Sequence, residues 1–231
     1  MVKMTNRNFF FGAAILLGLV FSTSCKRTCD DDLPDSGFKS ATVVYGGAPE
    51  VDGCGWKILI DSVFYHPVNL DLDYQITDLT ILIKYTNDPE EFRCGRGGIL
   101  YPSIKITEIK KDAKEVGFLK DDEWKKYSMD PFRLDSAYVK DDWLFMKVSY
   151  SGGCKEHELN LWKLPPNALV PPPIELALSH NANDDMCEAY LTRWLVFSLV
   201  PLRENGKKEI SFLLRGSPEM SAYFGQFEYK Y

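Results

Sequence analysis

Hydrophobic and polar residues alternate along most of the chain from residue 40 onward, with the two-residue period of a β-strand that has one buried face. Leu79, Ile81, Ile83 and Tyr85 share one parity, for example, while Thr80 and Lys84 fall on the other. Asp61-Ser62 separates two such segments and predicts a hairpin turn. The predicted strands are Ala41–Tyr45, Trp56–Asp61, Val63–Tyr65, Leu79–Thr86, Ser103–Ile109, Arg133–Val139, Trp143–Tyr150, Glu156–Trp162, Ile174–His180, Arg193–Pro201, Ile210–Arg215 and Phe224–Tyr229.

A polar stretch from Lys110 to Tyr127 interrupts this pattern and predicts a short helix or a linker. Five strands, a charged break and about seven strands favour an all-β protein with a small barrel followed by a sandwich. We therefore expect a barrel domain over 40–112 and a sandwich domain over 113–231, with the boundary between 110 and 130.

The first 24 residues have the pattern of a bacterial lipoprotein signal peptide. Lys3 and Arg7 precede an apolar run from Phe9 to Phe21, and small residues then lead directly to Cys25. The run is shorter than the roughly 20 apolar residues that a membrane-spanning helix needs. We predict that 1–24 is removed and that Cys25 takes a lipid, which would attach the protein to a membrane. An ordinary cleaved signal and a retained anchor helix are the alternatives.

Residues 25–39 form a charged segment with Asp30, Asp31 and Asp32 at its centre, which predicts a flexible tether. An acidic stretch soon after the lipidated cysteine resembles the arrangement in lipoproteins that Bacteroidetes-like bacteria display on their surface. We expect an outer-membrane lipoprotein that is exposed on the cell surface or, otherwise, faces the periplasm.

The composition is that of a globular protein, with 45% hydrophobic and 26% charged residues. The net charge of −6 argues against a nucleic-acid partner, because such binding depends on lysine and arginine neutralising phosphates.

Export also favours disulfide bonds among the cysteines that remain beside Cys25. Cys54 and Cys94 lie within the first β region, and Cys154 and Cys187 lie within the second. The economical pairing is one bridge in each region. It leaves Cys29, in the tether, as a free thiol.

The second cysteine pair has an alternative role, since Cys154, His157, His180 and Cys187 together could bind zinc or copper. His157 has the strand parity of Leu159, and both histidines are expected to point inward. The other possibilities are a disulfide beside two core histidines, or free thiols. The spacing of these residues does not decide between the metal site, the disulfide and the free thiols.

Enzyme motifs are missing from the sequence. It contains no GxSxG, no phosphate-binding GxxxxGK[ST] and no HExxH. His66 follows a predicted strand and is interpreted as a loop histidine, and acidic pairs such as Asp184-Asp185 are interpreted as solvated turns. We therefore predict a protein without catalytic residues or a cofactor.

Two motif sets resemble the NigD-like lipoproteins of Bacteroidetes, over roughly residues 40 to 231. The first set consists of Asp52-Gly53-Cys54-Gly55-Trp56 and Tyr65-His66-Pro67-Val68-Asn69-Leu70. The second set consists of Tyr150-Ser151-Gly152-Gly153-Cys154-Lys155-Glu156-His157, Leu178-Ser179-His180, Cys187-Glu188-Ala189 and Leu199-Val200-Pro201-Leu202.

This resemblance implies an OB-like barrel followed by an Ig-like β-sandwich. It also implies an association with bacteriocin production or immunity, and it supplies no catalytic residues. The expected function is a lipid-anchored binding or interaction protein whose partner is a glycan, a peptide or another envelope protein. The alternative is a metal-handling protein that uses the Cys2His2 set.

Overall fold

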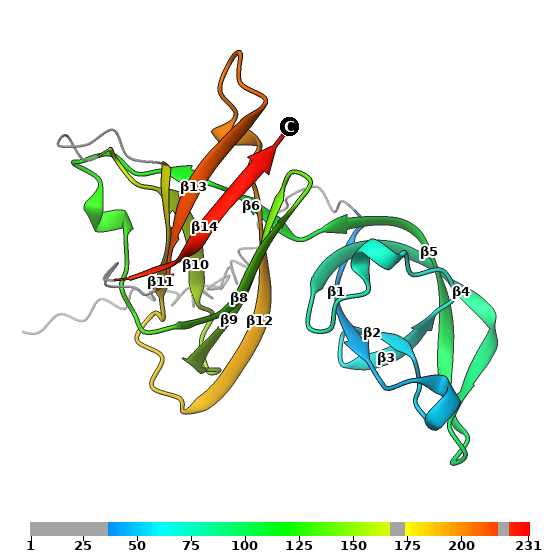
Figure 1. Cartoon of the computed structure of the whole chain (residues 1–231). Coiled ribbons are helices and arrows are strands. Elements are labelled where there is room, and N and C mark those ends of the chain that lie inside the picture. Colours follow the sequence, from blue (N-terminus) through cyan, green and yellow to red (C-terminus); the bar gives the residue numbers. More distant parts are fainter. Residues whose placement is uncertain (1–36, 167–173, 217–221) are drawn as a thin grey trace, which may run out of the picture. The chain divides into compact units, whose positions relative to one another are not determined.

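A computed structural model describes residues 37–166, 174–216 and 222–231, and all structural statements concern these residues (Figure 1). The predicted signal peptide 1–24, Cys25, Cys29 and the tether as far as residue 36 lie outside them.

The first five strands close into a barrel with the order β1-β2-β3-β5-β4 (Figure 1). Strands β3 and β5 pair in parallel, and the other neighbouring strands of the barrel pair antiparallel. A small closed five-stranded barrel with this order is the OB arrangement, which confirms the predicted fold. The strands are β1 Lys39–Tyr45, β2 Trp56–Ile60, β3 Val63–Pro67, β4 Thr80–Cys94 and β5 Ile99–Lys111, with short 3-10 turns η1 Pro49–Val51 and η2 Leu72–Tyr74.

Alternating apolar residues fill the interior of the barrel. Ile58, Ile81, Ile83 and Ile104 are fully buried, as the parity of the predicted strands requires. Their neighbours in sequence point outward, so the same alternation leaves an outer face on β2 and β3.

Two further sheets form the C-terminal sandwich, which encloses its own hydrophobic core and confirms the second predicted fold. One sheet has the order β14-β13-β11-β10-β7 and the other has the order β6-β12-β9-β8. The strands are β6 Ala113–Glu115, β7 Gly117–Phe118, β8 Arg133–Lys140, β9 Trp143–Gly152, β10 Glu158–Lys163, β11 Ile174–Asn181, β12 Ala189–Ser198, β13 Glu209–Arg215 and β14 Tyr223–Lys230, and η3 Trp124–Lys126 and η4 Val200–Leu202 are 3-10 turns.

The polar stretch from Lys110 to Tyr127 contains the short 3-10 turn η3, but it also contains strands that the prediction of a short helix or a linker did not include. It contains β6 and β7, which pair in parallel with β12 and β10. These strands have three and two residues, too few to show a period. Gly117 is necessary in β7 because a Cβ atom there would lie 2.6 Å from the ring of Trp162.

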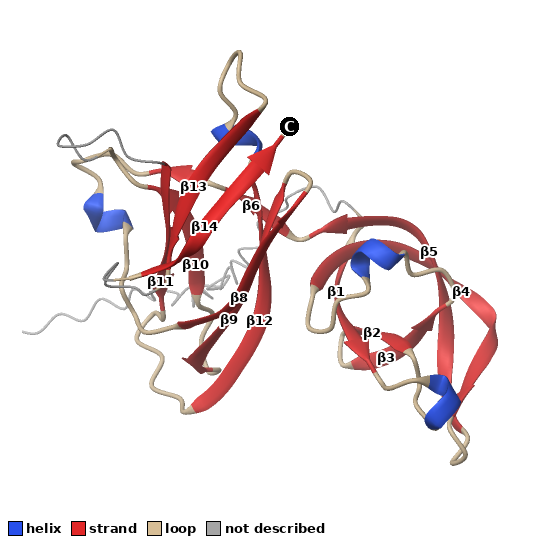
Figure 2. Cartoon of the chain, viewed as in Figure 1, coloured by secondary structure: helices blue, strands red, loops and turns tan. Residues whose placement is uncertain are grey.

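In the described part of the chain, no helix has the length and apolar character to cross a membrane. The only helical segments drawn in Figure 2 are short turns beside the strands.

Candidate functional site

The outer face of the barrel carries a continuous group of four rings and one lysine. Leu59 and Phe64 lie opposite each other on β2 and β3, on the side away from the buried Ile58 and Ile60. We call the group on this face the aromatic strip. It comprises Lys57 of β2, Phe64 and His66 of β3, Phe92 of β4 and Tyr101 of β5.

Direct contacts link the members of the aromatic strip. Phe64 and Tyr101 meet edge to face with their centroids 6.5 Å apart, and the Lys57 ammonium lies 4.5 Å and 5.2 Å from the same two centroids. Phe92 lies opposite Tyr101 in the β4–β5 pair and stacks on His66 at 3.9 Å. All five residues are half-buried, so the rings form a partly exposed surface.

Lys57 has no carboxylate within ion-pair distance among the described residues. Its positive charge is balanced only by the faces of two aromatic rings. A half-buried ammonium of this kind is available to a negatively charged group of a ligand.

His66 lies within β3 and not in a loop, which corrects the sequence interpretation. Its pairing with Ser103 of β5 holds it against Phe92. Burial lowers the pKa of His66, so the ring is neutral at physiological pH. Its Nδ1 atom is buried and has no hydrogen-bond partner among the described residues.

A disulfide joins the two loops beside the aromatic strip. Cys54 belongs to the loop 46–55 between β1 and β2, Cys94 ends β4 at the turn 95–98, and their Cα atoms are 5.0 Å apart. OB barrels commonly bind ligands with the face of strands 2 and 3 and with these same two loops. The bridge therefore holds both potential ligand-contacting loops in one position.

Glycine allows the loop 46–55 to fold tightly against itself. A Cβ atom on Gly53 would lie 2.2 Å from the carbonyl carbon of Gly47. The amide of Gly53 donates to Ala48, and Asp52 forms an ion pair with Arg96 at 3.2 Å across the two loops.

The second predicted bridge, between Cys154 and Cys187, is also present, with Cα atoms 5.9 Å apart. Asp185 lies at the centre of the two loops that this bridge joins. One oxygen of its carboxylate accepts hydrogen bonds from the backbone amides of Gly153, Cys154 and Lys155 at 2.8–2.9 Å. The other oxygen accepts from the amide of Cys187 at 2.9 Å.

These bonds fix the charge of Asp185. Hydrogen bonds from the amides of Cys187 and Lys155 hold its pKa well below the usual range, so the carboxylate is ionised. The side chain is only 1% exposed. The interpretation of Asp184-Asp185 as a solvated turn was therefore wrong for Asp185.

Two buried imidazoles continue the network, and we call them, together with Asp185, the His–Asp network. His157 Nε2 lies 3.2 Å from Asp185, and His157 Nδ1 lies 2.8 Å from His180 Nε2. His180 Nδ1 lies 3.0 Å from the carbonyl oxygen of Pro131. Tyr150 packs against both rings.

The proton count in this network follows from the hydrogen-bond acceptors at its ends. The carbonyl of Pro131 can only accept, so His180 Nδ1 carries a proton and Nε2 accepts from His157 Nδ1. His180 is therefore neutral, in keeping with a pKa that burial lowers. His157 Nε2 faces the Asp185 carboxylate at the other end of the network.

This geometry does not provide the predicted Cys2His2 metal set. The sulfurs of Cys154 and Cys187 are bonded to each other, and the imidazoles of His157 and His180 are hydrogen-bonded to each other. Asp185 also has an oxygen near the two sulfurs, yet its carboxylate is already occupied by backbone amides. Of the alternatives left open by the sequence, the structure contains the disulfide beside two core histidines.

Sequence reasoning missed Asp185, Tyr150 and Pro131 as parts of this network. The spacing Asp-x-Cys was the available signal, because an aspartate often accepts a hydrogen bond from the amide two residues later. Tyr150 and Pro131 carry no such local signal, since only the packing of β9 and of the segment before β8 places them here.

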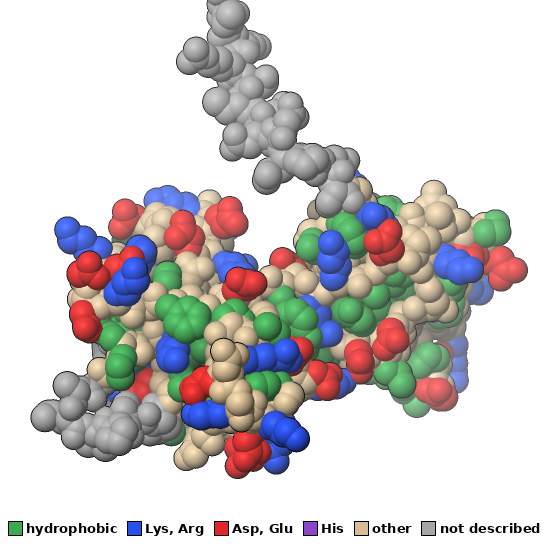
Figure 3. Space-filling model, turned by 90° about the horizontal axis from the view of Figure 1, so that it is seen from above, with side chains coloured by type: hydrophobic (Ala, Val, Ile, Leu, Met, Phe, Trp, Pro, Cys, Tyr) green, Lys and Arg blue, Asp and Glu red, His purple; other side chains and the backbone are tan. Residues whose placement is uncertain are grey.

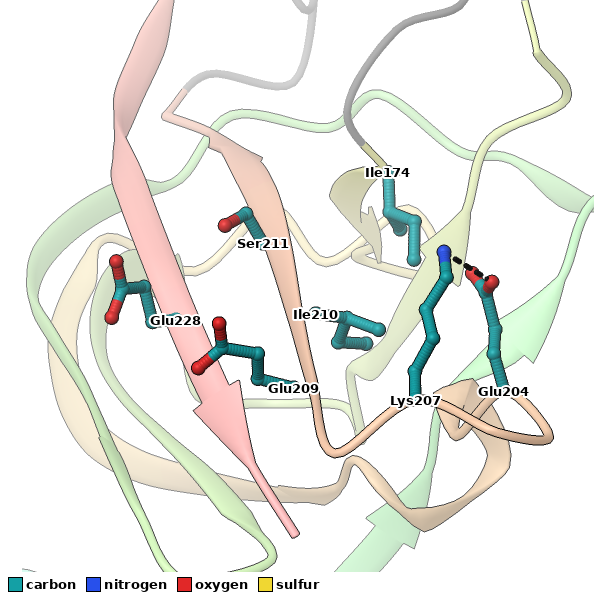
Figure 4. Close-up of a pocket in the computed structure, with 7 residues that line it drawn as sticks. All are labelled: Ile174, Glu204, Lys207, Glu209, Ile210, Ser211 and Glu228. Carbon is teal, nitrogen blue, oxygen red and sulfur yellow. Dashed lines mark ion pairs between the residues drawn. The ribbon is translucent and has the colours of Figure 1, made fainter.

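A surface hollow beside β13 and β14 is lined by three glutamates and a lysine (Figure 4). Lys207 pairs with Glu204 at 2.6 Å, and Lys230 lies 3.7 Å from both Glu209 and Glu228. Each carboxylate thus has an ammonium partner, and the pKa of Glu204 is lowered by its bond to Lys207. None of these groups is prepared to act as a general acid.

Acidic and basic side chains are mixed over the face drawn in Figure 3, with hydrophobic side chains between them. That face therefore lacks the single-sign field of a surface built for a polyanion.

A family-model match agrees with the sandwich fold described above. Residues 115–222 match the family model of the NigD-like C-terminal beta sandwich domain. No curated protein matches the chain. A protein of unknown function DUF1344 from Bacteroides vulgatus is similar in structure, with 16% identity, a TM-score of 0.41 and coverage of 84% of this chain and 90% of that one.

A NigD-like immunity protein from Bacteroides caccae is similar as well, with 14% identity, a TM-score of 0.42 and coverage of 78% of this chain and 85% of that one. The family-model match covers the second motif set of the sequence, from the cysteine at 154 to the one at 187. The predicted resemblance to the NigD-like proteins is confirmed by this family-model match, which covers residues 115–222.

Proposed function

We propose that this chain is a lipid-anchored, non-catalytic binding protein of the bacterial outer membrane that contacts its partner through the outer face of the barrel. The anchor is the lipid on Cys25, and the acidic segment after it holds the barrel and the sandwich away from the membrane.

The aromatic strip is the observation that carries this proposal. It combines half-buried rings with a lysine that has no carboxylate partner among the described residues. It also lies on the strands and beside the loops that OB barrels commonly use for binding. The Cys54–Cys94 bridge lowers the cost of binding, because the loops do not have to be ordered when the partner arrives.

The chemistry of the aromatic strip indicates which kind of partner it suits. Rings offer flat apolar surfaces, and the Lys57 ammonium offers a positive charge between them. A glycan, a peptide or another envelope protein fits if it presents a flat apolar group next to a negative charge. The absence of a role in catalysis is supported by the His–Asp network, whose groups are buried and bonded to each other.

A binding experiment with matched variants tests this function. Purified protein is titrated with outer-membrane glycans and, separately, with envelope peptides and proteins. Tyr101→Ala should weaken the affinity by about fivefold, since losing one aromatic contact costs about 1 kcal/mol. Lys57→Met keeps the aliphatic stem and should weaken binding in proportion to the negative charge of the ligand.

Tyr190 is the matched control, because it is an exposed tyrosine of β12 on the sandwich, 58% exposed. Tyr190→Ala should leave the affinity unchanged. Equal binding by the Tyr101→Ala and wild-type proteins, or equal loss in both tyrosine variants, would refute the role of the barrel face.

The anchor and the pathway need separate tests in cells. Cys25→Ser should abolish labelling by a fatty-acid analogue and release the protein from the membrane fraction, whereas Cys29→Ser should not. The association with bacteriocin production or immunity rests on family resemblance, and it predicts that deleting the protein changes the sensitivity of the cells to a bacteriocin. Unchanged sensitivity would remove that association and leave the binding role standing.

A further inference from the structure

One arginine in the sandwich points toward the hydrophobic core without a charged partner. Arg193 of β12 shares its strand face with Leu191 and Leu195, and both leucines pack against the buried core of the sandwich. Arginine is rarely buried unless it is paired. Among the described residues, no carboxylate lies within ion-pair distance of Arg193.

The contacts that Arg193 does make leave most of its donors unused. Its guanidinium lies over the ring of Tyr150 at 5.4 Å, and one terminal nitrogen reaches the carbonyl oxygen of His157 at 3.5 Å, which is a weak bond. Its Nε atom is buried and has no partner among the described residues. A buried donor without a partner costs about 1–3 kcal/mol, so this geometry is favourable only if another group accepts from it.

Arg193 also lines a partly enclosed hollow of about 150 Å³. Lys114 of β6 lines the same hollow, and its ammonium donates to the carbonyl oxygen of Leu159 at 3.0 Å. Lys114 has no ion pair among the described residues either. The hollow therefore brings together two cations, one of them with a donor that is already desolvated.

The His–Asp network does not supply an anion for Arg193. His157 lines the hollow and is bonded to His180 and Asp185. The Asp185 carboxylate already accepts from backbone amides. The positive charge of Arg193 is therefore left without an anion of its own.

Glu156 and Asp112 line the hollow as well, although neither forms an ion pair with Arg193 or Lys114. Both residues are exposed. Their negative charges oppose the entry of a dianion and favour a ligand with a single negative charge.

We propose that this hollow is a binding site for a small carboxylate, which accepts two hydrogen bonds from the Arg193 guanidinium and one from Lys114. Guanidinium and carboxylate groups match in such a two-pronged geometry. The flat ring of Trp194, which also lines the hollow, offers apolar contact for the remainder of the ligand. Thr80 of β4 lines the hollow as well, but no residue of the aromatic strip does, so the site does not depend on the barrel-face binding proposed above.

The test is a titration that observes Arg193 directly. The Nε–H signal of Arg193, assigned by its loss in Arg193→Lys, is followed by ¹H–¹⁵N NMR while acetate, a larger monocarboxylate such as benzoate, or inorganic phosphate is added at constant ionic strength. We expect a saturable downfield shift with both carboxylates, a weaker one with phosphate, and at least a tenfold loss of affinity in Lys114→Met.

The control is Arg133→Gln, which removes an exposed arginine that is already paired with Asp135. It should leave the titration unchanged. A response to phosphate that is as strong as the response to carboxylate would overturn the assignment to carboxylates, and no saturable response to any probe would overturn the site.

Glu156 could also fill the role of the ligand by rotating onto Arg193. Glu156→Gln separates the two cases. If Glu156 is the natural partner, this variant is less stable than wild type, its effect disappears in an Arg193→Gln background, and the proposal is wrong. If the site takes an external carboxylate, Glu156→Gln is as stable as wild type and binds acetate more tightly.

Discussion

The described residues contain two disulfides of similar loop length, and different forces hold the two in place. In the barrel, Cys54–Cys94 joins loops whose geometry depends on backbone packing and glycine, with Gly53 against Gly47. In the sandwich, Cys154–Cys187 joins loops that are organised by the buried charge of Asp185.

This difference matters because backbone packing is insensitive to pH, whereas a buried network of charges is not. The barrel bridge fixes two loops beside the aromatic strip and leaves their surface unchanged over a wide range of conditions. The sandwich bridge is coupled to His157 and His180, so acid should affect it first.

Removing the bridges should give the largest effects. The paired changes Cys54→Ser with Cys94→Ser and Cys154→Ser with Cys187→Ser open loops with sequence separations of 40 and 33. Each should lower the free energy of unfolding by about 4 kcal/mol in the chain-entropy model, as measured by urea denaturation.

Hydrogen exchange should then separate the two regions. Without Cys54–Cys94, the amides of the loop 46–55 should exchange much faster. Without Cys154–Cys187, the amides of Gly153 and Cys154 should stay protected, because the Asp185 carboxylate still accepts from them. Equal loss of protection in both regions would show that Asp185 does not hold the loops by itself.

Adding a single methyl group should come next in size. Gly53→Ala would place Cβ 2.2 Å from backbone atoms of Gly47, and Gly152→Ala would place it 2.4 Å from His157 Nε2 at a φ of +150°. Each should cost about 2–4 kcal/mol in the free energy of unfolding, measured by urea denaturation. Gly97→Ala is the control, since nothing lies within 4 Å of the added atom, and it should change stability by less than about 0.5 kcal/mol.

The two glycine variants should differ in their response to acid. Gly152→Ala displaces the His157 ring and should alter the pH dependence of unfolding, while Gly53→Ala should lower stability equally at all pH values. If the free energy of unfolding depended on pH in the same way in both variants, the proposed difference in pH sensitivity between the two regions would be contradicted.

The strand alternation was sufficient to predict most of the fold, because each long strand has one buried face. The predictions were least complete where that condition fails. β4 extends to Cys94 and β5 begins at Ile99, beyond the predicted ends at Thr86 and Ser103, since this ribbon is bulged and its residues are largely exposed. β6 and β7 are set by neighbouring strands and not by their own sequence.

The candidate sites were predicted only in part for a similar reason. Parity correctly indicated that His157 and His180 point inward, and both are buried. It could not show that Asp185, from an acidic turn, would join them, because that contact forms between loops that are far apart in the sequence. The aromatic strip draws on four strands, so no local segment of the sequence contains it.

Replacing the central carboxylate should have a smaller effect than adding the methyl groups. Asp185→Asn turns one acceptor oxygen into a donor that faces the amides of Gly153 and Cys154, and it removes the carboxylate that His157 Nε2 contacts. We expect the melting temperature to fall by about 5 °C or more, measured by calorimetry. Asp184→Asn is the matched control, because Asp184 is exposed and asparagine tolerates its positive φ of 53°.

An equal shift in both aspartate variants would mean that the turn itself, and not the buried carboxylate, determines stability. A smaller shift for Asp185→Asn than for Asp184→Asn would contradict the assigned role of the network.

The smallest expected effect is a change in the slope of stability with pH. Burial, followed by the nearby charge of His157, lowers the pKa of His180 below its ordinary value of 6.5. Below pH 6.5 the unfolded chain therefore takes up a proton that the folded chain does not, and stability is lost as the pH falls. His180→Gln cannot titrate, yet its amide can still accept from one neighbour and donate to another.

The urea midpoint of His180→Gln, followed from pH 7.5 to pH 5, should therefore fall less steeply than that of the wild type. His66→Gln offers the comparison within the barrel. Burial lowers the pKa of His66 too, so this variant should also flatten the slope of stability with pH.

The two histidines differ in their contacts, because His66 stacks on Phe92 of the aromatic strip and His180 is bonded to His157. If the proposals hold, His66→Gln should change ligand affinity at the barrel face while His180→Gln leaves it intact, and the reverse result would exchange the roles of the two regions.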